Sequence, residues 1–300
     1  MGQRLIVQTL CVDERKQDPN TVVGIGKRDV RKKHGFRIIS LNSQGMPSEK
    51  HDVMSATFDY LKADLILIQE SWMHPDWNVR IQGYTWKGGS GISTGGKTMM
   101  RGIGVLIADG YVLFKCRDKE LNVSPNAMWF RLKLMDNDKR CAYVCTVYMP
   151  FTDSKITEIA ICKAFCVLTK QIGYLRYTYP GAIIILGGDF NSHTGKLLSD
   201  FGSSKPPDYA GRYMMEWIHD NKLYVHNAHT PCLNTTRTNY RKGKVTSHSI
   251  IDYFVSTGCT GLEAFAIDGT GISDHNLLVC VVTSTLCTCR RVNSPTIESM

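Results

Sequence analysis

Residues 182–194 read Ala-Ile-Ile-Ile-Leu-Gly-Gly-Asp-Phe-Asn-Ser-His-Thr, and this stretch decides the fold that the sequence predicts. The apolar, β-branched run at its start is typical of a buried strand. We expect Gly187 and Gly188 to end the strand, with Asp189 and Asn191 directly after it. On an extended chain residues two apart point the same way, so a carboxylate and an amide would project side by side. The alternative is an ordinary polar turn, since Asp and Asn are common turn residues.

Composition indicates a globular protein with a polyanionic partner. The 300 residues include 43% hydrophobic and 21% charged residues, which is ordinary for globular domains and enough for one large domain or two small ones. The formal net charge of +9 favours nucleic acid before membrane lipid, although a merely basic soluble surface is the alternative. Two stretches hold much of this charge: Lys27, Arg28, Arg31, Lys32 and Lys33, and later Arg237, Arg241, Lys242 and Lys244.

The cysteines and the absence of long apolar runs indicate the cellular compartment of the protein. The chain has 11 cysteines, mostly in apolar contexts. Cys141 with Cys145, and Cys162 with Cys166, are four apart, and we expect core thiols because no His stands at zinc spacing. No stretch is long enough to span a bilayer, and no signal peptide is evident. These features favour a reduced intracellular protein, nuclear if the source is eukaryotic, with no membrane partner.

Periodicity predicts an α/β domain over residues 36–283 without an internal boundary, preceded by a flexible basic arm (1–35) and followed by a disordered tail (284–300). We expect helices at 51–62, 152–174 and 211–222, the second capped by Asp153 or Ser154. Asp109-Gly110 signals a hairpin. The expected strands cover residues 36–41, 63–69, 102–108, 128–134, 141–148, 249–255 and 276–282.

Polar residues recur where the predicted strands end. They are Asn42, Glu70, Tyr148, Asp189, Asn191, Asp252, Asp274 and His275. Strands of one sheet end on a common rim, so residues distant in sequence can converge there. Each alone has a structural explanation: Glu70 could cap a helix, and His275 could be a satisfied structural histidine. Their ordered recurrence at strand ends favours a joint role.

This set contains what metal-assisted phosphodiester hydrolysis requires. Glu70, with Asn42 and Asp274, could supply hard oxygen ligands to a divalent ion. Asp189, held by Asn191, could orient and activate a water molecule.

The remaining members suit the charge that grows on the phosphate. His275 could stabilise that charge, with Asp252 holding the ring and favouring its charged form. Tyr148 could contact a phosphate oxygen or the leaving oxygen.

The ordered series resembles the successive motifs of the endonuclease/exonuclease/phosphatase superfamily over nearly all of residues 36–283. The resemblance implies a deoxyribonuclease I-like four-layer α/β sandwich, in which two packed mixed β-sheets are flanked by helices and one rim binds Mg²⁺ or Mn²⁺. The motifs are Leu41-Asn42-Ser43-Gln44-Gly45, Ile68-Gln69-Glu70-Ser71, Val147-Tyr148-Met149-Pro150, Gly188-Asp189-Phe190-Asn191, Ser249-Ile250-Ile251-Asp252-Tyr253 and Ser273-Asp274-His275.

Carried over residue by residue, the resemblance implies Glu70 as the main metal ligand and Asn42 as its neighbour. It implies that Asp189 and Asn191 orient water and phosphate, that Asp252 and His275 form an orienting pair, and that Asp274 is a second metal or network carboxylate. One departure is Gln44, which stands where apurinic endonucleases of the superfamily often have an acidic residue. An amide is a weaker metal ligand.

Within the superfamily the chain is most similar to the apurinic-type endonuclease domain of non-LTR retrotransposons. Those domains carry Thr before a basic loop and then Ser-x-Ile-Asp-Tyr, as Thr235 to Arg237 and Ser249 to Tyr253 do here. The resemblance implies that the loop at 236–249 contacts the backbone of duplex DNA; a solvated hairpin is the alternative. The implied substrate-binding residues are Thr236, Arg237, Arg241, Lys242 and Ser273.

We therefore expect a Mg²⁺-dependent DNA endonuclease that nicks one strand. Rivals are a phosphatase of the same fold with a small phosphorylated substrate, an RNA-cleaving deadenylase-like nuclease and an inactive binding scaffold. Ser249 to Tyr253 lacks the Trp-Cys-Asp-Arg type motif of inositol phosphatases. The reverse transcriptase usual in such elements does not follow, so a fragment, a domesticated remnant and a free-standing nuclease all stay open. No other protein partner is predicted.

Overall fold

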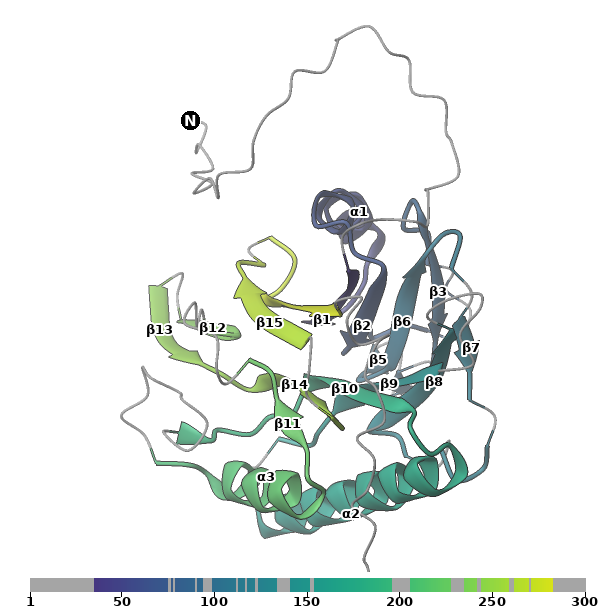
Figure 1. Ribbon diagram of the computed structural model, residues 1–300. Helices are drawn as coiled ribbons and strands as arrows, with labels where there is room; N and C mark the ends of the chain where they lie inside the picture. The colour runs from purple at the N-terminus through teal and green to yellow at the C-terminus, as the bar shows by residue number, and fades with distance from the viewer. Residues whose placement is uncertain are drawn as a thin grey trace, which may run out of the picture.

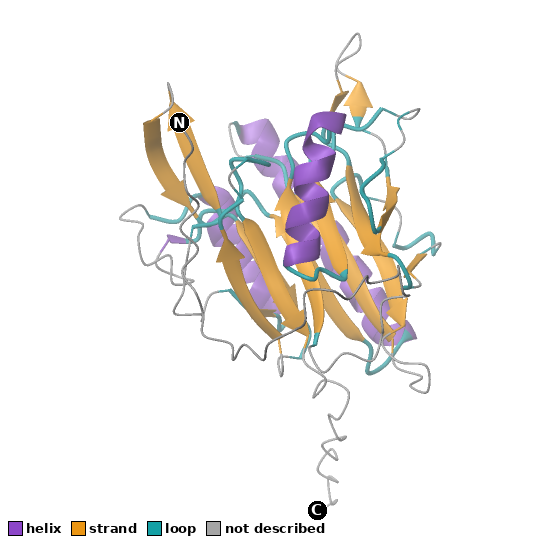
Figure 2. Cartoon of the chain, turned by 90° about the horizontal axis from the view of Figure 1, so that it is seen from above, coloured by secondary structure: helices purple, strands orange, loops and turns teal. Residues whose placement is uncertain are grey.

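Two β-sheets packed face to face form the centre of the computed structural model, with helices on both outer faces (Figure 1). From top to bottom in Figure 1 the layers follow one another as helix, sheet, sheet and helices, and Figure 2 looks down this stack, with one helix in front of the strands and the others behind them. This arrangement confirms the four-layer α/β sandwich predicted from the sequence. The structure describes residues 35–74, 77, 79–89, 91–93, 99–111, 113–116, 118–121, 124–133, 141–151, 154–195, 206–227, 235–241, 244–258, 262–269 and 271–282.

The first sheet has the strand order β15-β16-β1-β2-β6-β3. Its central strands β1 and β2 run parallel, and the other pairings are antiparallel. On its outer face α1 buries Met54 and Phe58 against the sheet. The bounds are β1 Phe36–Asn42, η1 Ser48–Lys50, α1 His51–Tyr60, β2 Leu65–Gln69, β3 Tyr84–Gly88, β6 Ile103–Ala108, β15 Leu262–Ile267 and β16 Leu277–Val282.

The second sheet has the order β11-β14-β10-β9-β8-β7, with β9 and β10 parallel. Its outer face is covered by α2 and α3, where Phe165 and Trp217 pack with ring centroids 5.0 Å apart. Ser154 caps α2 as predicted, because its Oγ accepts from the Thr157 N–H at 3.4 Å. The bounds are β7 Leu113–Lys115, β8 Ala127–Lys133, β9 Cys141–Tyr148, α2 Lys155–Thr178, β10 Ile183–Asp189, α3 Tyr209–Asp220, β11 Tyr224–Val225 and β14 Asp252–Ser256.

Two small antiparallel pairs stand outside the main sheets. They are β4 (Ile92–Ser93) with β5 (Met99–Met100), and β12 (Arg237–Arg241) with β13 (Lys244–Ser249). The second pair, called the basic hairpin below, extends beyond β14 and β15 at one side of the sandwich (Figure 1). The stretch that the sequence suggested as a loop is therefore largely a β-hairpin.

Three expectations about local structure are wrong. Gly187 and Gly188 do not end the strand, because β10 continues to Asp189. The Asp109-Gly110 turn does not close a hairpin; β6 pairs with β2 and β3, and the chain crosses to the second sheet, where β7 pairs with β8.

The third concerns the cysteines, where Cys145 and Cys280 are buried but Cys162 is only half-buried and Cys166 is exposed. Both lie on α2, where Cys162 Sγ contacts the Tyr209 hydroxyl of α3 at 3.1 Å. The arm at 1–34, the tail from 283 and the side chain of Cys141 fall outside the described residues. Among the helices that the structure describes, none has both the length and the apolar character needed to cross a bilayer.

The glycines of β10 have a packing role. A Cβ at Gly188 would lie 1.9 Å from the Val147 carbonyl oxygen, and one at Gly187 would lie 2.3 Å from the Phe254 ring. The neighbouring strands β9 and β14 can approach β10 closely only because these side chains are absent.

Gly188→Ala is expected to lower the free energy of unfolding by about 2–3 kcal/mol, because β9 must move to admit the methyl group. Gly173→Ala is the matched control, since nothing lies within 4 Å of its Cβ position on α2; it should raise stability by about 0.5–1 kcal/mol. Urea unfolding monitored by circular dichroism measures both. Equal stability of the Gly188 variant and the parent would contradict the close approach.

Candidate functional site

The predicted polar residues meet at one edge of the sandwich. Asn42 and Gln69 are partners at the ends of the parallel strands β1 and β2. In the second sheet Asp189 pairs with Tyr148 on one side and with Asp252 on the other. Parallel strands that end in register bring their last side chains to a common rim, and here the rims of both sheets adjoin.

The Asn42 amide connects the two rims. Its Nδ2 donates to Asp189 Oδ2 at 2.9 Å and to Glu70 Oε1 at 3.1 Å. Asn42 is 1% exposed, so both hydrogen bonds form out of bulk water, where they are stronger. One side chain from the first sheet therefore fixes a carboxylate of each sheet.

Glu70 follows β2 directly, with φ +48°, a conformation that non-glycine residues rarely adopt. Its Oε1 also accepts the Tyr148 hydroxyl at 2.7 Å. Burial and the adjacent Glu70 carboxylate raise the pKa of Tyr148 far above its ordinary value, so the phenol keeps its proton and donates. Neither of these hydrogen bonds uses Oε2 of Glu70.

Asp189 is almost completely buried. It accepts from the Asn42 side chain and, at 2.8 Å, from the backbone N–H of Asn191. Burial and repulsion by Asp252 raise the pKa of Asp189 to about 7, against the lowering effect of His275. A carboxyl group with this pKa can exchange a proton near neutral pH.

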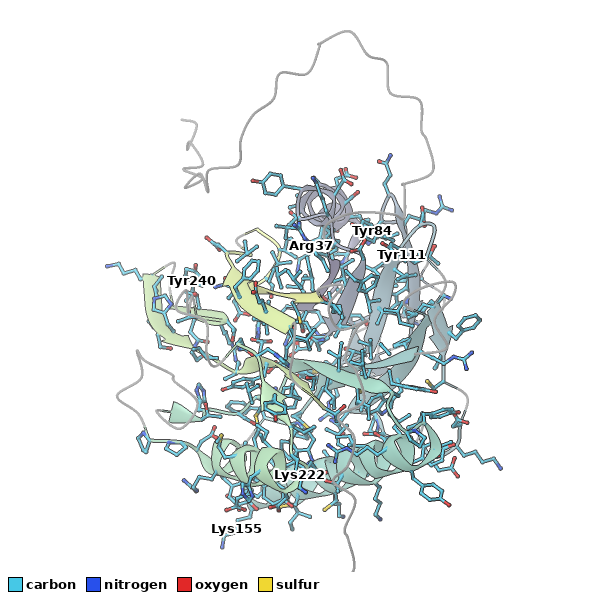
Figure 3. The ribbon with its side chains drawn as sticks, in the orientation of Figure 1. Arg37, Tyr84, Tyr111, Lys155, Lys222 and Tyr240 are labelled. Carbon is cyan, nitrogen blue, oxygen red and sulfur yellow. The ribbon has the colours of Figure 1, made fainter. Side chains whose placement is uncertain are left out.

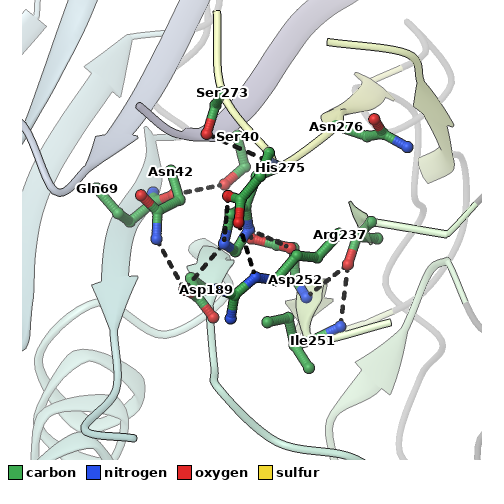
Figure 4. Close-up of polar contacts among 12 residues, drawn as sticks. Ser40, Asn42, Gln69, Asp189, Arg237, Ile251, Asp252, Ser273, His275 and Asn276 are labelled. Atoms are coloured by element: carbon green, nitrogen blue, oxygen red, sulfur yellow. Dashed lines mark hydrogen bonds and ion pairs between the residues drawn. The ribbon is translucent and has the colours of Figure 1, made fainter. Parts of the chain in front are cut away.

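His275 lies between carboxylates, as Figure 4 shows. Its Nδ1 contacts Asp252 Oδ2 at 3.0 Å, and its Nε2 faces Asp274 Oδ1 at 3.7 Å and Asp189 Oδ2 at 3.9 Å. Burial lowers the pKa of His275, but the charge and hydrogen bond of Asp252, with the charges of Asp189 and Asp274, raise it to about 9. The ring is therefore held as a cation at neutral pH.

Asn191 differs from the expectation in conformation. Its φ is +46°, so it does not extend the strand and its side chain does not run parallel to that of Asp189. The amide instead donates to the Met149 carbonyl at 2.9 Å, and the backbone N–H contacts Asp189. Asn191 holds the end of β10 against β9 and positions Asp189 through its main chain.

The expected substrate-binding residues lie mainly at the root of the basic hairpin. Thr236 is 1% exposed, and its hydroxyl accepts from the N–H groups of Ile251 and Asp252 at 3.0 and 3.1 Å. Arg237 Nε donates to Asp274 Oδ2 at 3.2 Å, and Ser273 Oγ accepts the His275 N–H at 3.2 Å. These groups hold the rim together. The Arg241 side chain and Lys242 lie outside the described residues.

Sequence reasoning missed several residues that support this rim. Lys50 Nζ donates to the carbonyl oxygens of Ser43, Gln44 and Gly45 at 2.8, 3.3 and 3.3 Å, and so fixes the turn after Asn42. Asn227 donates to the Asp252 carbonyl at 3.0 Å. Lys50 contacts carbonyls across a turn, and Asn227 contacts a carbonyl far away in sequence. No local sequence motif predicts either contact.

The donor set suits a divalent cation. Asp274 Oδ1 is buried yet has no hydrogen-bond partner among the described residues, which is unusual for a carboxylate oxygen. Ligand atoms of Asp189, Asp252 and His275 also lie within 4.8 Å of one another. This cluster differs from the expected ligands Glu70, Asn42 and Asp274. We favour the expected set, because Asp252 uses both oxygens on the His275 ring.

Comparison with known proteins finds likeness only in solved structures. The sequence matches no family model and no curated protein. The endonuclease domain of TRAS1, a telomere-specific non-LTR retrotransposon, is 17% identical, with a TM-score of 0.57 over 82% of this chain and 98% of that one. The catalytic domain of Xenopus laevis APE2 is 15% identical, with a TM-score of 0.63 over 83% and 92%.

A third similar structure is the 3′ phosphatase NExo from Neisseria bound to a product DNA hairpin. It is 15% identical, with a TM-score of 0.63 over 82% of this chain and 99% of that one. At such identities the likeness establishes the fold. The chain thus has the endonuclease/exonuclease/phosphatase fold, and the resemblance drawn from its ordered motifs is confirmed at that level.

Proposed function

We propose that this chain is a divalent-metal-dependent DNA endonuclease that hydrolyses a phosphodiester by in-line attack of water. The observation that supports this most is the connected site: Tyr148, Glu70, Asn42 and Asp189 form a continuous hydrogen-bonded series, and His275 Nε2 stands 3.9 Å from Asp189. Similar structures include nucleases and a 3′ phosphatase, which supports a hydrolase acting on phosphate esters.

Asp189 is the proposed general base. The attacking water forms a bond from its oxygen to phosphorus and gives its proton to Asp189, while the bond from phosphorus to the leaving oxygen breaks. A pKa of about 7 makes this carboxylate a stronger base than an ordinary aspartate, while a large fraction of it stays ionised at neutral pH and can accept a proton. The hydrogen bonds from Asn42 and from the Asn191 N–H fix its orientation.

His275 and Tyr148 are the proposed donors to the phosphate. His275, held by Asp252, carries the positive charge that stabilises negative charge on the non-bridging oxygens. The Tyr148 hydroxyl, kept protonated next to Glu70, gives its one hydrogen to Glu70 Oε1 in the free site. On substrate binding it would turn from Glu70 to donate to a phosphate oxygen or to the leaving oxygen. Asn191 positions the base, and Asp252 keeps the ring oriented.

Glu70 with Asn42 and Asp274 would hold Mg²⁺ or Mn²⁺, and the ion would neutralise charge on the phosphate as a Lewis acid. Oxygen donors of this kind suit a hard cation. Gln44 adds little, since an amide is a weak ligand. Its backbone N–H contacts Asn42 Oδ1 at 3.2 Å, so Asn42 would release this hydrogen bond to offer that oxygen to the ion.

Duplex DNA is the proposed substrate because the basic hairpin flanks the site and the net charge is +9. A retrotransposon-type role in target cleavage, with a reverse transcriptase module in the parent element and a nuclear location in a eukaryote, extends this proposal.

The phosphatase rival draws support from the 3′ phosphatase among the similar structures. Phosphate release from a 3′-phosphorylated strand without plasmid nicking would favour it, and preference for poly(A) would favour the deadenylase-like nuclease.

Metal binding is testable without turnover. Mg²⁺ at about 100 times its Kd should raise the free energy of unfolding by about 2.7 kcal/mol, and Glu70→Gln should remove most of this gain by weakening the main ligand. Glu263→Gln, at an exposed position on β15, is the control and should respond as the parent does. Thermal unfolding with Mg²⁺ or chelator measures the difference; a full response of the Glu70 variant would remove it from the metal site.

Activity should depend on the site residues. Supercoiled plasmid should be nicked in Mg²⁺ and left intact in chelator, and Glu70→Gln and His275→Ala should each lower the rate by about 10²–10⁴-fold. His219→Ala is the control, because that ring is exposed on α3. Retention of the parent rate by either site variant would refute the role given to that residue.

The basic hairpin should carry phosphate contacts. Replacing Arg241, Lys242 and Lys244 with Ala should weaken duplex binding and reduce the slope of log K against log salt by about 0.9 for each lost contact. Arg237 is left intact because it contacts Asp274.

The charge-matched control replaces Lys155, Lys163 and Lys170 on α2, in the helical layer where Figure 3 shows Lys155. Binding titrations at several salt concentrations compare the two triple variants. An unchanged slope for the hairpin variant, or an equal loss in the control, would exclude the hairpin from DNA binding.

A further inference from the structure

A pocket of about 420 Å³ lies next to the segment that carries Glu70. Met46 and Met73, both buried, line it. Pro47 and Trp77 also line it, and Trp77 is 57% exposed. The exposed Glu49 also lines it. The site described above uses none of these groups.

The pocket and Glu70 are built on the same two backbone segments. The Gly45 N–H donates to the Glu70 carbonyl at 2.7 Å, and the Met46 N–H donates to the Ser71 carbonyl at 3.1 Å. A ligand held over Met46 therefore has a fixed position relative to the Glu70 carboxylate.

The connecting backbone is also strained. Gln44, Glu70 and Trp72 have φ of +45°, +48° and +51°, a region that is costly for non-glycine residues and that clusters at ligand sites. Gly45 leaves the space that the Trp72 ring fills, since a Cβ there would lie 2.7 Å from that ring. This backbone conformation therefore fixes the position of the pocket relative to Glu70.

We propose that this pocket binds one unstacked nucleobase of the DNA strand whose phosphate lies at the Glu70 rim. The proposal rests on the proposed nuclease function and names a subsite for it. An exposed indole is a platform on which any base can stack. Two thioethers and a proline ring complete an apolar slot, since Met sulfur packs well against aromatic rings.

Glu49 gives the slot a preference among bases. A carboxylate only accepts hydrogen bonds, so it pairs with the exocyclic amino group of cytosine, as acidic side chains do in base recognition. Thymine offers a carboxylate only its N3–H, which lies between two carbonyl oxygens that repel it, whereas the cytosine amino group has two N–H donors. The pocket should therefore hold cytosine more tightly than thymine.

The test measures binding to duplexes that carry one bulged nucleotide, either cytosine, thymine or an abasic residue, in chelator so that no strand is cut. The full chain should bind the cytosine bulge most tightly. Trp77→Ala should raise its Kd about 10-fold by removing the stacking surface, and Trp77→Phe should restore most of the affinity. Glu49→Gln should reduce the preference for cytosine over thymine while leaving the abasic duplex unaffected.

Phe114→Ala is the control, because that ring is exposed on β7 in the other sheet, and it should change no Kd. Circular dichroism confirms that each variant is folded. If the chain nicks plasmid in Mg²⁺ but Trp77→Ala leaves every Kd unchanged, the pocket has another occupant and this inference is refuted while the nuclease proposal stands. If the chain neither nicks plasmid nor binds these duplexes, both proposals are refuted.

Discussion

The rest of the site depends on one amide that connects the two sheets. Asn42 Nδ2 has two hydrogens, and it uses them on Asp189 of the second sheet and on Glu70 at the end of the first. Without this bridge the two rims would present separate carboxylates that repel each other across the sandwich. With it, a proposed metal ligand and a proposed base keep a fixed separation, which hydrolysis of a phosphodiester requires.

Burial sets the chemistry of the remaining groups. Asp189, Asp252 and His275 are each at most 2% exposed, and buried charges persist only when they are paired and hydrogen-bonded. The arrangement leaves one cationic ring among three carboxylates, a local excess of negative charge. A divalent cation would balance that excess, which is why the buried Asp274 Oδ1, which accepts no hydrogen bond from the described residues, supports a metal here.

The sequence predicted the parts of this structure that local pattern determines. Apolar runs located β2, β9, β10 and β16, because buried strands cannot be polar, and polar residues after those runs located the rim. It did not predict β3 and β15, which alternate or mix polar residues. It gave the basic hairpin only as an alternative to a loop, because the exposed strands of the hairpin carry no apolar signal.

The misses at the site share one cause. Asn191 adopts a left-handed conformation because its amide reaches Met149, directly after β9. Lys50 is important because it reaches three carbonyls of the turn before it. Such contacts are set by tertiary packing, which residue type and spacing do not encode. The role of Thr236 as an internal anchor was missed for the same reason, since its partners Ile251 and Asp252 lie on the far side of the basic hairpin in sequence. Ser273 differs, because it contacts the N–H of His275, two residues on, in a local turn.

A double-mutant cycle in the free energy of unfolding, with Asn42→Ala, Asp189→Ala and the pair, tests the bridge most directly. A buried hydrogen bond across the sheets predicts a coupling of about 0.5–3 kcal/mol between the two substitutions. Strict additivity of the two single effects would contradict it, since residues that do not touch contribute independently, and the convergence on which the proposed function depends would then lack its central contact.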